Sequence, residues 1–181
     1  MDPVDRLWQR IEVVWQRQPC ATILRPGASK HAIEEAERTL DVIFPEDVRV
    51  SCRRHDGGYS VKLVSTMDVL PVEDMVEWWQ VLEELRQDEE WERQQPYYFT
   101  ENVLSSGWKT GPIQPVWWHP RWIPFAYDPT GNIACIDLAP AVGGAMGQIL
   151  DWDHECGPSR VLFPSFERLR AALAEQVASG H

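Results

Sequence analysis

The spacing of apolar residues predicts amphipathic helices in the first part of the chain. Within residues 4–17 apolar side chains recur every three or four positions, which places them on one face of a helix that stops before Pro19. Ser29 is a typical N-cap for a second helix, because its hydroxyl can accept a hydrogen bond from an unpaired backbone N–H. The buried stripe of this second helix is expected to contain Ile33, Ala36 and Leu40.

A third helix is predicted to begin at Pro45, since proline suits the start of a helix. It should hold Val48 and Cys52 inward and end at residues 55–58, where a double glycine can adopt the left-handed C-cap conformation.

Two further helices follow from the same periodicity. A long one is predicted from Pro71 to about Glu90, and a last one begins after Ser165, which is a suitable N-cap. The inward residues of the long helix are expected to be Met75, Trp78, Leu82 and Leu85, with Trp79 beside them. Those of the last helix are expected to be Phe166, Leu169, Leu173 and Val177.

A tryptophan-rich hairpin is the predicted centre of the sheet. Two apolar runs, Trp117–Tyr127 and Ile133–Leu138, flank Asp128–Asn132, a cluster of turn-forming residues. Three tryptophans fall within six positions of the first run, and their rings bury large apolar areas. Other strands are predicted at residues 59–64, 67–70, 148–153 and 160–163.

The order of these elements predicts an α+β fold with a mostly antiparallel sheet covered on one side by helices. Consecutive strands joined by short turns favour antiparallel pairing over a βαβ arrangement. The 181 residues fit one domain, spanning 1–181, with an irregular insertion around residues 91–116. A loop of that length in a compact domain is typical of a binding loop or a lid.

The net charge of the chain limits the kinds of molecule that it is expected to bind. The formal net charge is -11 and the pI about 4.8, so the chain repels phosphate backbones and anionic lipid heads. We therefore expect neither nucleic-acid nor membrane binding, and a basic protein as the favoured partner. The four cysteines are widely spaced, which indicates reduced thiols and a cytoplasmic location. The N-terminal residues lack the features of a signal peptide, and no apolar run reaches the roughly 20 residues of a membrane span.

The long helix starting at Pro71 carries most of this negative charge. Its outward carboxylates are interpreted either as a solvated helix face or as a docking surface for a basic partner. The residues predicted for partner binding are Asp74, Glu77, Glu83, Glu84 and Asp88, with Trp79, Trp91 and Trp108 as candidate aromatic anchors.

Motifs for catalysis or metal binding are missing from the sequence. It contains no G-x-G-x-x-G, P-loop, G-x-S-x-G or H-E-x-x-H pattern, so we predict no cofactor. Asp151, Asp153 and Glu155 would share one side of a strand and could bind a metal, but an Asx turn at a strand end explains them more simply and no metal is predicted. His119 would need Asp128 or Asp137 as a partner to act as a base. A histidine packed between tryptophans is the commoner arrangement.

The motifs resemble those of the SUKH superfamily along nearly the whole chain. The N-terminal part of this pattern comprises Gly27–Ser29, Ile33–Glu37, Phe44–Val48 and His55–Gly58. The later part comprises Trp122–Ala126, Asp128, Gly131, Ile136–Leu138, Gly147–Ile149 and Trp152. The insertion at 91–116 is not part of the pattern.

The resemblance implies an α+β binding domain without enzymatic activity. The superfamily includes the fungal cell-wall assembly regulator and bacterial immunity proteins that neutralise polymorphic toxins, often nucleases. We therefore expect an immunity protein that blocks a basic toxin domain through its acidic surface. A regulatory scaffold with an endogenous partner is the alternative, and a hydrolase using His119 or His154 is a third hypothesis. Residues expected at the centre of the fold or along a groove are Trp118, His119, Trp122, Asp128 and Asp137.

Overall fold

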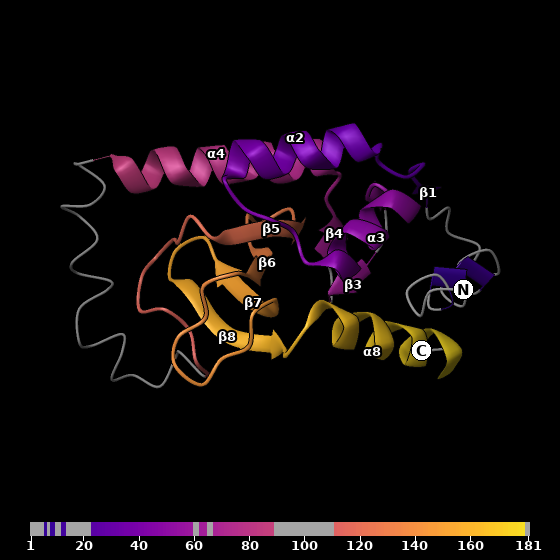
Figure 1. Ribbon diagram of the computed structural model, residues 1–181. Coiled ribbons are helices and arrows are strands. Elements are labelled where there is room, and N and C mark those ends of the chain that lie inside the picture. Colours follow the sequence, from indigo (N-terminus) through magenta and orange to yellow (C-terminus); the bar gives the residue numbers. More distant parts are fainter. Residues whose placement is uncertain are drawn as a thin grey trace.

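The protein has an α+β fold, which confirms the fold class expected from the sequence. Its structure, a computed structural model, describes residues 6, 8, 9, 12, 13, 23–59, 62–64, 67–88 and 111–179. The helices with described bounds are α2 (Lys30–Leu40), α3 (Glu46–Arg54), α4 (Val72–Gln87) and α8 (Phe166–Ser179). In the view of Figure 1, α2 and α4 run along the upper border of the antiparallel sheet and α8 along its lower border.

The main sheet has six strands whose order in space follows their order in the chain. The strands are β3 (Lys62–Val64), β4 (Met67–Val69), β5 (Trp122–Tyr127), β6 (Ile133–Asp137), β7 (Gln148–Asp153) and β8 (Gly157–Phe163). Each adjacent pair is antiparallel. A separate two-stranded sheet joins β1 (Ile23–Leu24) to β2 (Gly58–Tyr59). The single strand predicted at residues 59–64 is therefore wrong, because its two ends belong to different sheets.

The central hairpin is confirmed. Strands β5 and β6 pair through Ile123 and Ile136, and the turn between them is closed by Asp128. The Asp128 carboxylate accepts hydrogen bonds from the backbone N–H of Thr130 at 2.8 Å and of Asn132 at 3.0 Å. The first arm is shorter than predicted, since Trp117 and Trp118 precede the strand. Of the three tryptophans, only Trp122 lies in β5.

The two faces of the sheet bury different sets of side chains. Because side chains alternate along a strand, Ala134 and Ile136 of β6 join a core formed with α2, α3, α8 and the start of α4. Ile133 and Cys135 point to the opposite face. That second core contains Leu82, Ile113, Trp117, Trp118, Trp122, Leu150 and Trp152. The expectation of helices on one side is met, and the other side is covered by the irregular segment 111–121 and by Leu82 of α4.

Edge-to-face tryptophan contacts hold segment 111–121 on the sheet. The ring of Trp152 lies 5.0 Å from that of Trp117 and 6.0 Å from that of Trp118, and Trp118 lies 5.9 Å from Trp122. The indole Nε1 of Trp152 also donates to the carbonyl of Trp117 at 2.7 Å. Each such ring pair contributes about 0.5–1.5 kcal/mol beyond its buried area. These contacts explain how a stretch without regular structure can cover a sheet face.

The helix α2 starts as predicted and ends in a tight left-handed turn. The Ser29 hydroxyl accepts from the backbone N–H of Ala32 at 3.0 Å, which confirms the N-cap. At the other end Asp41 has φ +51°, and its N–H points to the carbonyls of Glu37 and Arg38. Val42 then donates to Glu37 at 3.0 Å. Two of the carbonyls at the end of the helix, those of Glu37 and Arg38, are thereby satisfied within the turn.

The double glycine does not cap α3, which corrects the prediction. The C-cap of α3 is His55 in an extended conformation, and the left-handed residue is Gly57, with φ +69°. This turn places Asp56 at the start of α4, where its carboxylate accepts from the Val72 N–H at 2.7 Å. A negative charge is favoured at a helix N-terminus, so the motif joins α3 to α4.

In α4 and α8, one residue predicted to face inward is exposed, and some of the other predicted residues lie outside the part of the chain that the structure describes. Leu85 of α4 is 38% exposed and does not face the core. In α8 the Ser165 cap is confirmed by a hydrogen bond from the Arg168 N–H at 3.2 Å, and Phe166 and Leu169 are buried. The side chains of Leu173 and Val177 lie outside the described residues, as do residues 89 and 90 at the predicted end of the long helix.

We predict that Gly57→Ala destabilises the protein more than Gly143→Ala. Both glycines have positive φ, +69° and +91°, so either alanine meets backbone strain of about 1–2 kcal/mol. A Cβ on Gly57 would also lie 2.6 Å from the nitrogen of Pro71, whereas one on Gly143 meets nothing within 4 Å. Urea unfolding of the two variants measures the difference. Equal losses of stability would show that the Gly57 turn can relax away from Pro71.

Candidate protein-binding surface

The outer side of α4 combines negative charge with exposed apolar side chains. The helix begins after Pro71, and Val72, Met75 and Leu82 anchor its inner side in the two cores. Its outward residues define what we call the α4 face: Glu77, Val81, Glu84, Leu85 and Asp88. Val81 is 50% exposed and lies one turn from Leu85, so the pair forms an apolar strip between carboxylates.

Two of the carboxylates of α4 are neutralised within the protein. Glu73 accepts a hydrogen bond from the guanidinium of Arg25 at 3.0 Å. Glu83 accepts two from Arg86 and one from Gln87, and only 12% of its side chain is exposed. The hydrogen bonds from Arg86 hold the pKa of Glu83 below its ordinary value. Glu83, a predicted binding residue, is therefore engaged with its own helix.

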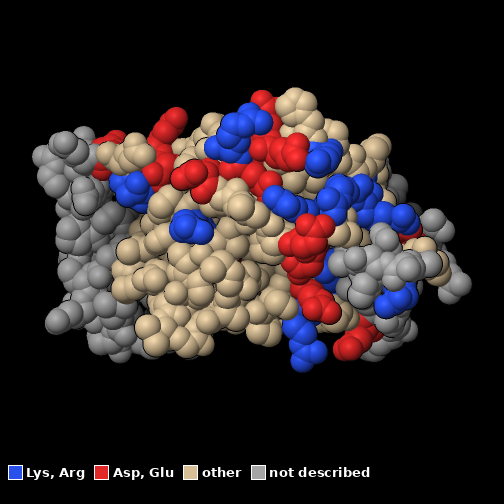
Figure 2. All heavy atoms as spheres, viewed as in Figure 1, with Lys and Arg blue, Asp and Glu red and all other residues tan. Residues whose placement is uncertain are grey.

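The pKa of Asp74 reflects its burial and the excess of negative charge at the start of α4. Burial raises its pKa above the ordinary value, and the charges of Glu73 and Glu77 raise it further. Arg25 acts in the opposite direction without restoring the ordinary value. Carboxylates that repel one another favour the approach of a cation. Figure 2 shows that, on the face in view, acidic and basic side chains are intermixed over the helices, and few of either lie over the sheet loops.

Trp79, the one predicted aromatic anchor among the described residues, is not part of the α4 face. Trp79 is half-buried, packs against both cores and donates from Nε1 to the carbonyl of Pro120 at 2.8 Å. This hydrogen bond fixes α4 against segment 111–121, so Trp79 supports the α4 face from the buried side of the helix. Trp91 and Trp108 lie outside the described residues. The apolar contribution of Val81 was not predicted, because the sequence alone does not show where the buried stripe of α4 stops.

Two of the residues predicted at the fold centre, Trp122 and Asp137, belong to a buried hydrogen-bond cluster around the Asp137 carboxylate. Its Oδ1 accepts from Trp122 Nε1 at 3.0 Å and from the Ala139 N–H at 2.8 Å. Its Oδ2 accepts from Gln148 Nε2 at 2.8 Å, and the same amide donates to the carbonyl of Pro112 at 3.0 Å. This geometry assigns Asp137 and Trp122 to holding the sheet together. Trp118 packs beside Trp122 in the second core.

His119 does not meet a carboxylate partner in the described part of the chain. It is half-buried against Trp122, and its Nδ1 accepts from the Arg121 N–H at 3.1 Å. Asp128 is occupied in the hairpin turn and Asp137 in its own cluster, so neither forms an ion pair with His119 within 4.0 Å. Burial lowers the pKa of His119, which favours its neutral form. The histidine–carboxylate pair that the hydrolase hypothesis requires is therefore not formed at His119.

The acidic run after β7 is an Asx turn. The Asp153 carboxylate accepts from the N–H groups of Glu155 and Cys156, each at 2.9 Å, and Asp151 pairs with Arg160 at 3.1 Å. Across the described ranges no three His, Cys, Asp or Glu side chains are grouped so that they could hold a metal. His154 is exposed, with Nδ1 3.1 Å from the Asn132 side-chain oxygen.

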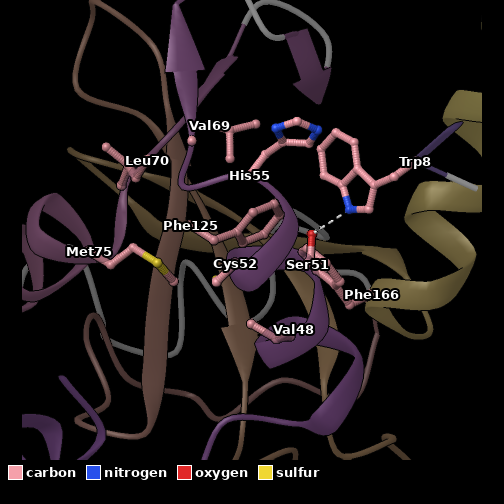
Figure 3. A pocket seen from close by; sticks show the side chains of 11 residues that line it. Trp8, Val48, Ser51, Cys52, His55, Val69, Leu70, Met75, Phe125 and Phe166 are labelled. Atoms are coloured by element: carbon pink, nitrogen blue, oxygen red, sulfur yellow. Dashed lines mark hydrogen bonds between the residues drawn. The ribbon is translucent and has the colours of Figure 1, made fainter. Parts of the chain in front are cut away.

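A small cavity beneath Trp8 is too narrow for a ligand. Its volume is about 20 Å³, which is room for a water molecule, against several hundred Å³ for typical ligand pockets. Figure 3 shows Trp8 reaching over it to donate from Nε1 to the Ser51 hydroxyl at 3.1 Å. Nearby Glu12 lies 2.6 Å from His55 Nε2 and forms two hydrogen bonds with Arg54. These contacts dock Trp8 and Glu12 onto α3 and its C-cap residue, His55. In the described ranges no helix has the length and hydropathy needed to cross a membrane.

Comparison with known proteins relates this chain to fungal regulators. A sequence model of the SMI1 / KNR4 family (SUKH-1) matches residues 27–171. The glucan synthesis regulatory protein of Neurospora crassa is 28% identical over 184 residues, which cover 87% of this chain and 35% of that protein. The cell wall biosynthesis/cell cycle regulator smi1 of Schizosaccharomyces pombe is 27% identical, covering 98% of this chain and 37% of that protein.

A third relative gives the same picture. The cell wall assembly regulator SMI1 of Saccharomyces cerevisiae is 24% identical, covering 89% of this chain and 37% of that protein. The chain thus spans about a third of the length of these curated relatives. All three are named as regulators and none as an enzyme.

We predict that Asp137 titrates above, and Asp128 below, the ordinary Asp pKa of 3.8. Burial raises the pKa of Asp137 by more than its three hydrogen bonds lower it. Burial also raises the pKa of Asp128, but hydrogen bonds from Thr130 and Asn132 outweigh it and the net shift is downward. Carbon-13 NMR of the two carboxyl carbons against pH measures both values.

These shifts affect stability in opposite directions. Asp137 binds its proton more tightly in the folded state, so its contribution is largest below pH 3.8 and decreases as the pH rises through its folded-state pKa. The contribution of Asp128 is present above pH 3.8 and is lost as the pH falls through its folded-state pKa. A common midpoint for the two carboxyls would contradict the buried geometry of Asp137.

Proposed function

The chain belongs to the SMI1/KNR4 family (SUKH-1), and from this premise we propose that it is a non-enzymatic protein-binding domain that acts as a regulatory scaffold. The observation that carries the proposal is the match of 87–98% of the chain to proteins named as regulators of fungal glucan and cell-wall synthesis. The partner is a protein of the host cell in the cytoplasm. The chain spans about a third of the length of these relatives, so the match to them concerns the domain that they share.

The α4 face supports the proposed mode of binding. Glu77 and Glu84 lie two helical turns apart on the same side of α4, and neither forms an ion pair with another described residue. Exposed carboxylates of this kind accelerate the encounter with a basic partner. Val81 and Leu85 lie between them and supply apolar area, which slows dissociation once the partner has docked. The rigid attachment of α4 through Trp79 keeps this surface in place.

The regulatory role is preferred to toxin immunity. An acidic surface would suit a basic toxin nuclease as well as a basic host protein, so charge does not separate the two functions. The names of the relatives favour the regulatory role, since each is named as a regulator of wall or glucan synthesis. The immunity hypothesis has no comparable support.

We predict that a Glu77→Lys/Glu84→Lys variant loses its partner while Glu167→Lys/Glu175→Lys retains it. The second pair makes the same charge change on exposed positions of α8, and so it controls for net charge. The tagged chain is purified by affinity from the cells that produce it, and mass spectrometry identifies and quantifies the captured proteins. Binding should also weaken sharply in about 1 M salt, where the Debye length is about 3 Å.

The identity of the captured protein decides between the functions. A host protein acting in wall or glucan synthesis supports the scaffold role. A secreted toxin domain encoded beside the chain would replace that role with immunity. Capture that is equal for both double variants would remove the α4 face as the docking surface, with circular dichroism confirming that the variants are folded.

A further inference from the structure

A second candidate binding surface, which differs in charge from the α4 face, lies between the end of α2 and the loop before β7. It is an open groove of about 550 Å³, a size that accommodates several side chains of a bound segment. One wall is the left-handed turn after α2, and the other is the loop that carries Met146. The two walls meet near Pro45, since a Cβ on Gly147 would lie 3.7 Å from Pro45 Cγ.

The groove has an apolar floor and exposed apolar rims. Val42 and Leu138 are buried beneath it, with 7% and 4% of their surfaces exposed. Ile43 and Met146 border it and are 74% and 66% exposed, which is unusual for side chains of this size. Large apolar side chains on both sides of a groove are typical of a site that holds an apolar side chain from a partner.

Two arginines make the groove basic in an acidic protein. Arg38 and Arg121 line it, and neither forms an ion pair with another residue in the part of the chain that the structure describes. The nearest buried acid, Glu37, is already neutralised by Arg49 through two hydrogen bonds of 2.7 Å. Asp41 is the remaining acid of the groove and offsets one of the two positive charges. The formal charges of the lining residues alone cancel, but because Glu37 is paired with Arg49 outside the groove, Arg38 and Arg121 together exceed the remaining acid, Asp41, by one positive charge, although the net charge of the chain is -11.

From this arrangement we infer that the groove binds an extended, acidic peptide segment of a protein partner. An apolar side chain of the segment lies between Ile43 and Met146, and carboxylates next to it bind Arg38 and Arg121. Nucleic acid is a poorer occupant, because its repeated phosphates would be repelled by the rest of the surface. The inference rests on the proposed function only in treating the chain as a protein-binding domain. Its ligand has the opposite charge to the partner of the α4 face.

Selection from a phage-displayed library of random heptapeptides, with the full chain as bait, tests this inference. We expect the enriched peptides to carry a large apolar residue with Asp or Glu beside it. A fluorescein-labelled enriched peptide is then titrated against variants by fluorescence anisotropy. Arg121→Glu should weaken binding by about tenfold or more, as expected when a charge-assisted hydrogen bond is replaced by repulsion. Ile43→Ser should also weaken it.

Matched controls separate this site from the α4 face. Arg168→Glu makes the same change at an exposed arginine of α8 that lies outside the groove, and it should alter the dissociation constant less than twofold (roughly the effect of a remote surface charge). Glu77→Lys/Glu84→Lys should leave peptide binding intact even if it abolishes capture of the basic partner. Enrichment of no peptide, enrichment of peptides without acidic residues, or equal binding to the Arg121 and Arg168 variants would overturn the inference.

Discussion

The buried carboxylate of Asp137 adds side-chain hydrogen bonds between strands that are already paired through their backbones. It receives hydrogen bonds from Trp122 in β5, from the turn after β6 and from Gln148 in β7. Gln148 extends the cluster to Pro112, in the segment that covers the second face of the sheet. A buried carboxylate left without such donors would cost about 1–3 kcal/mol or more. Because every partner comes from a different segment, these hydrogen bonds fix the segments relative to one another.

The tryptophan layer and the helices divide the sheet between them. On one face α2, α3 and α8 bury the aliphatic side chains of the central strands, as in many α+β proteins. On the other face the rings of Trp117, Trp118 and Trp152 replace a layer of helices. Helix α4 lies between these two cores, since Met75 belongs to the first and Leu82 to the second. This shared position determines which side of α4 is left for solvent, and hence the composition of its exposed face.

Local signals in the sequence predicted the fold well, whereas contacts between distant residues could not be read from it. The Ser29 cap and the hairpin around Asp128 depend on neighbouring residues, and both are confirmed. The role of the double glycine was wrong because it depends on the close approach of Gly57 to Pro71, which is set by the tertiary fold. Leu85 has the helical spacing of a core residue, but it is 38% exposed and belongs to neither of the two cores formed by the described residues.

The candidate surfaces illustrate the same limit. The carboxylates of the long helix were visible in the sequence, but Arg25 is 48 residues away from Glu73 and no pattern links the two. Likewise Arg38 and Arg121 belong to no motif and meet only because α2 ends beside the sheet.

The arrangement of the sheet also limits how this protein can associate with others. Strand addition needs a long, regular edge with free backbone donors, and such edges promote polymerisation. Here one edge strand, β3, has only three residues, and the other, β8, contains Pro158, which has no N–H to offer. Main-chain pairing with a second chain is therefore disfavoured at both borders. Recognition falls instead to side chains on helices and loops, whose chemistry can diverge between relatives while the scaffold that carries them stays unchanged.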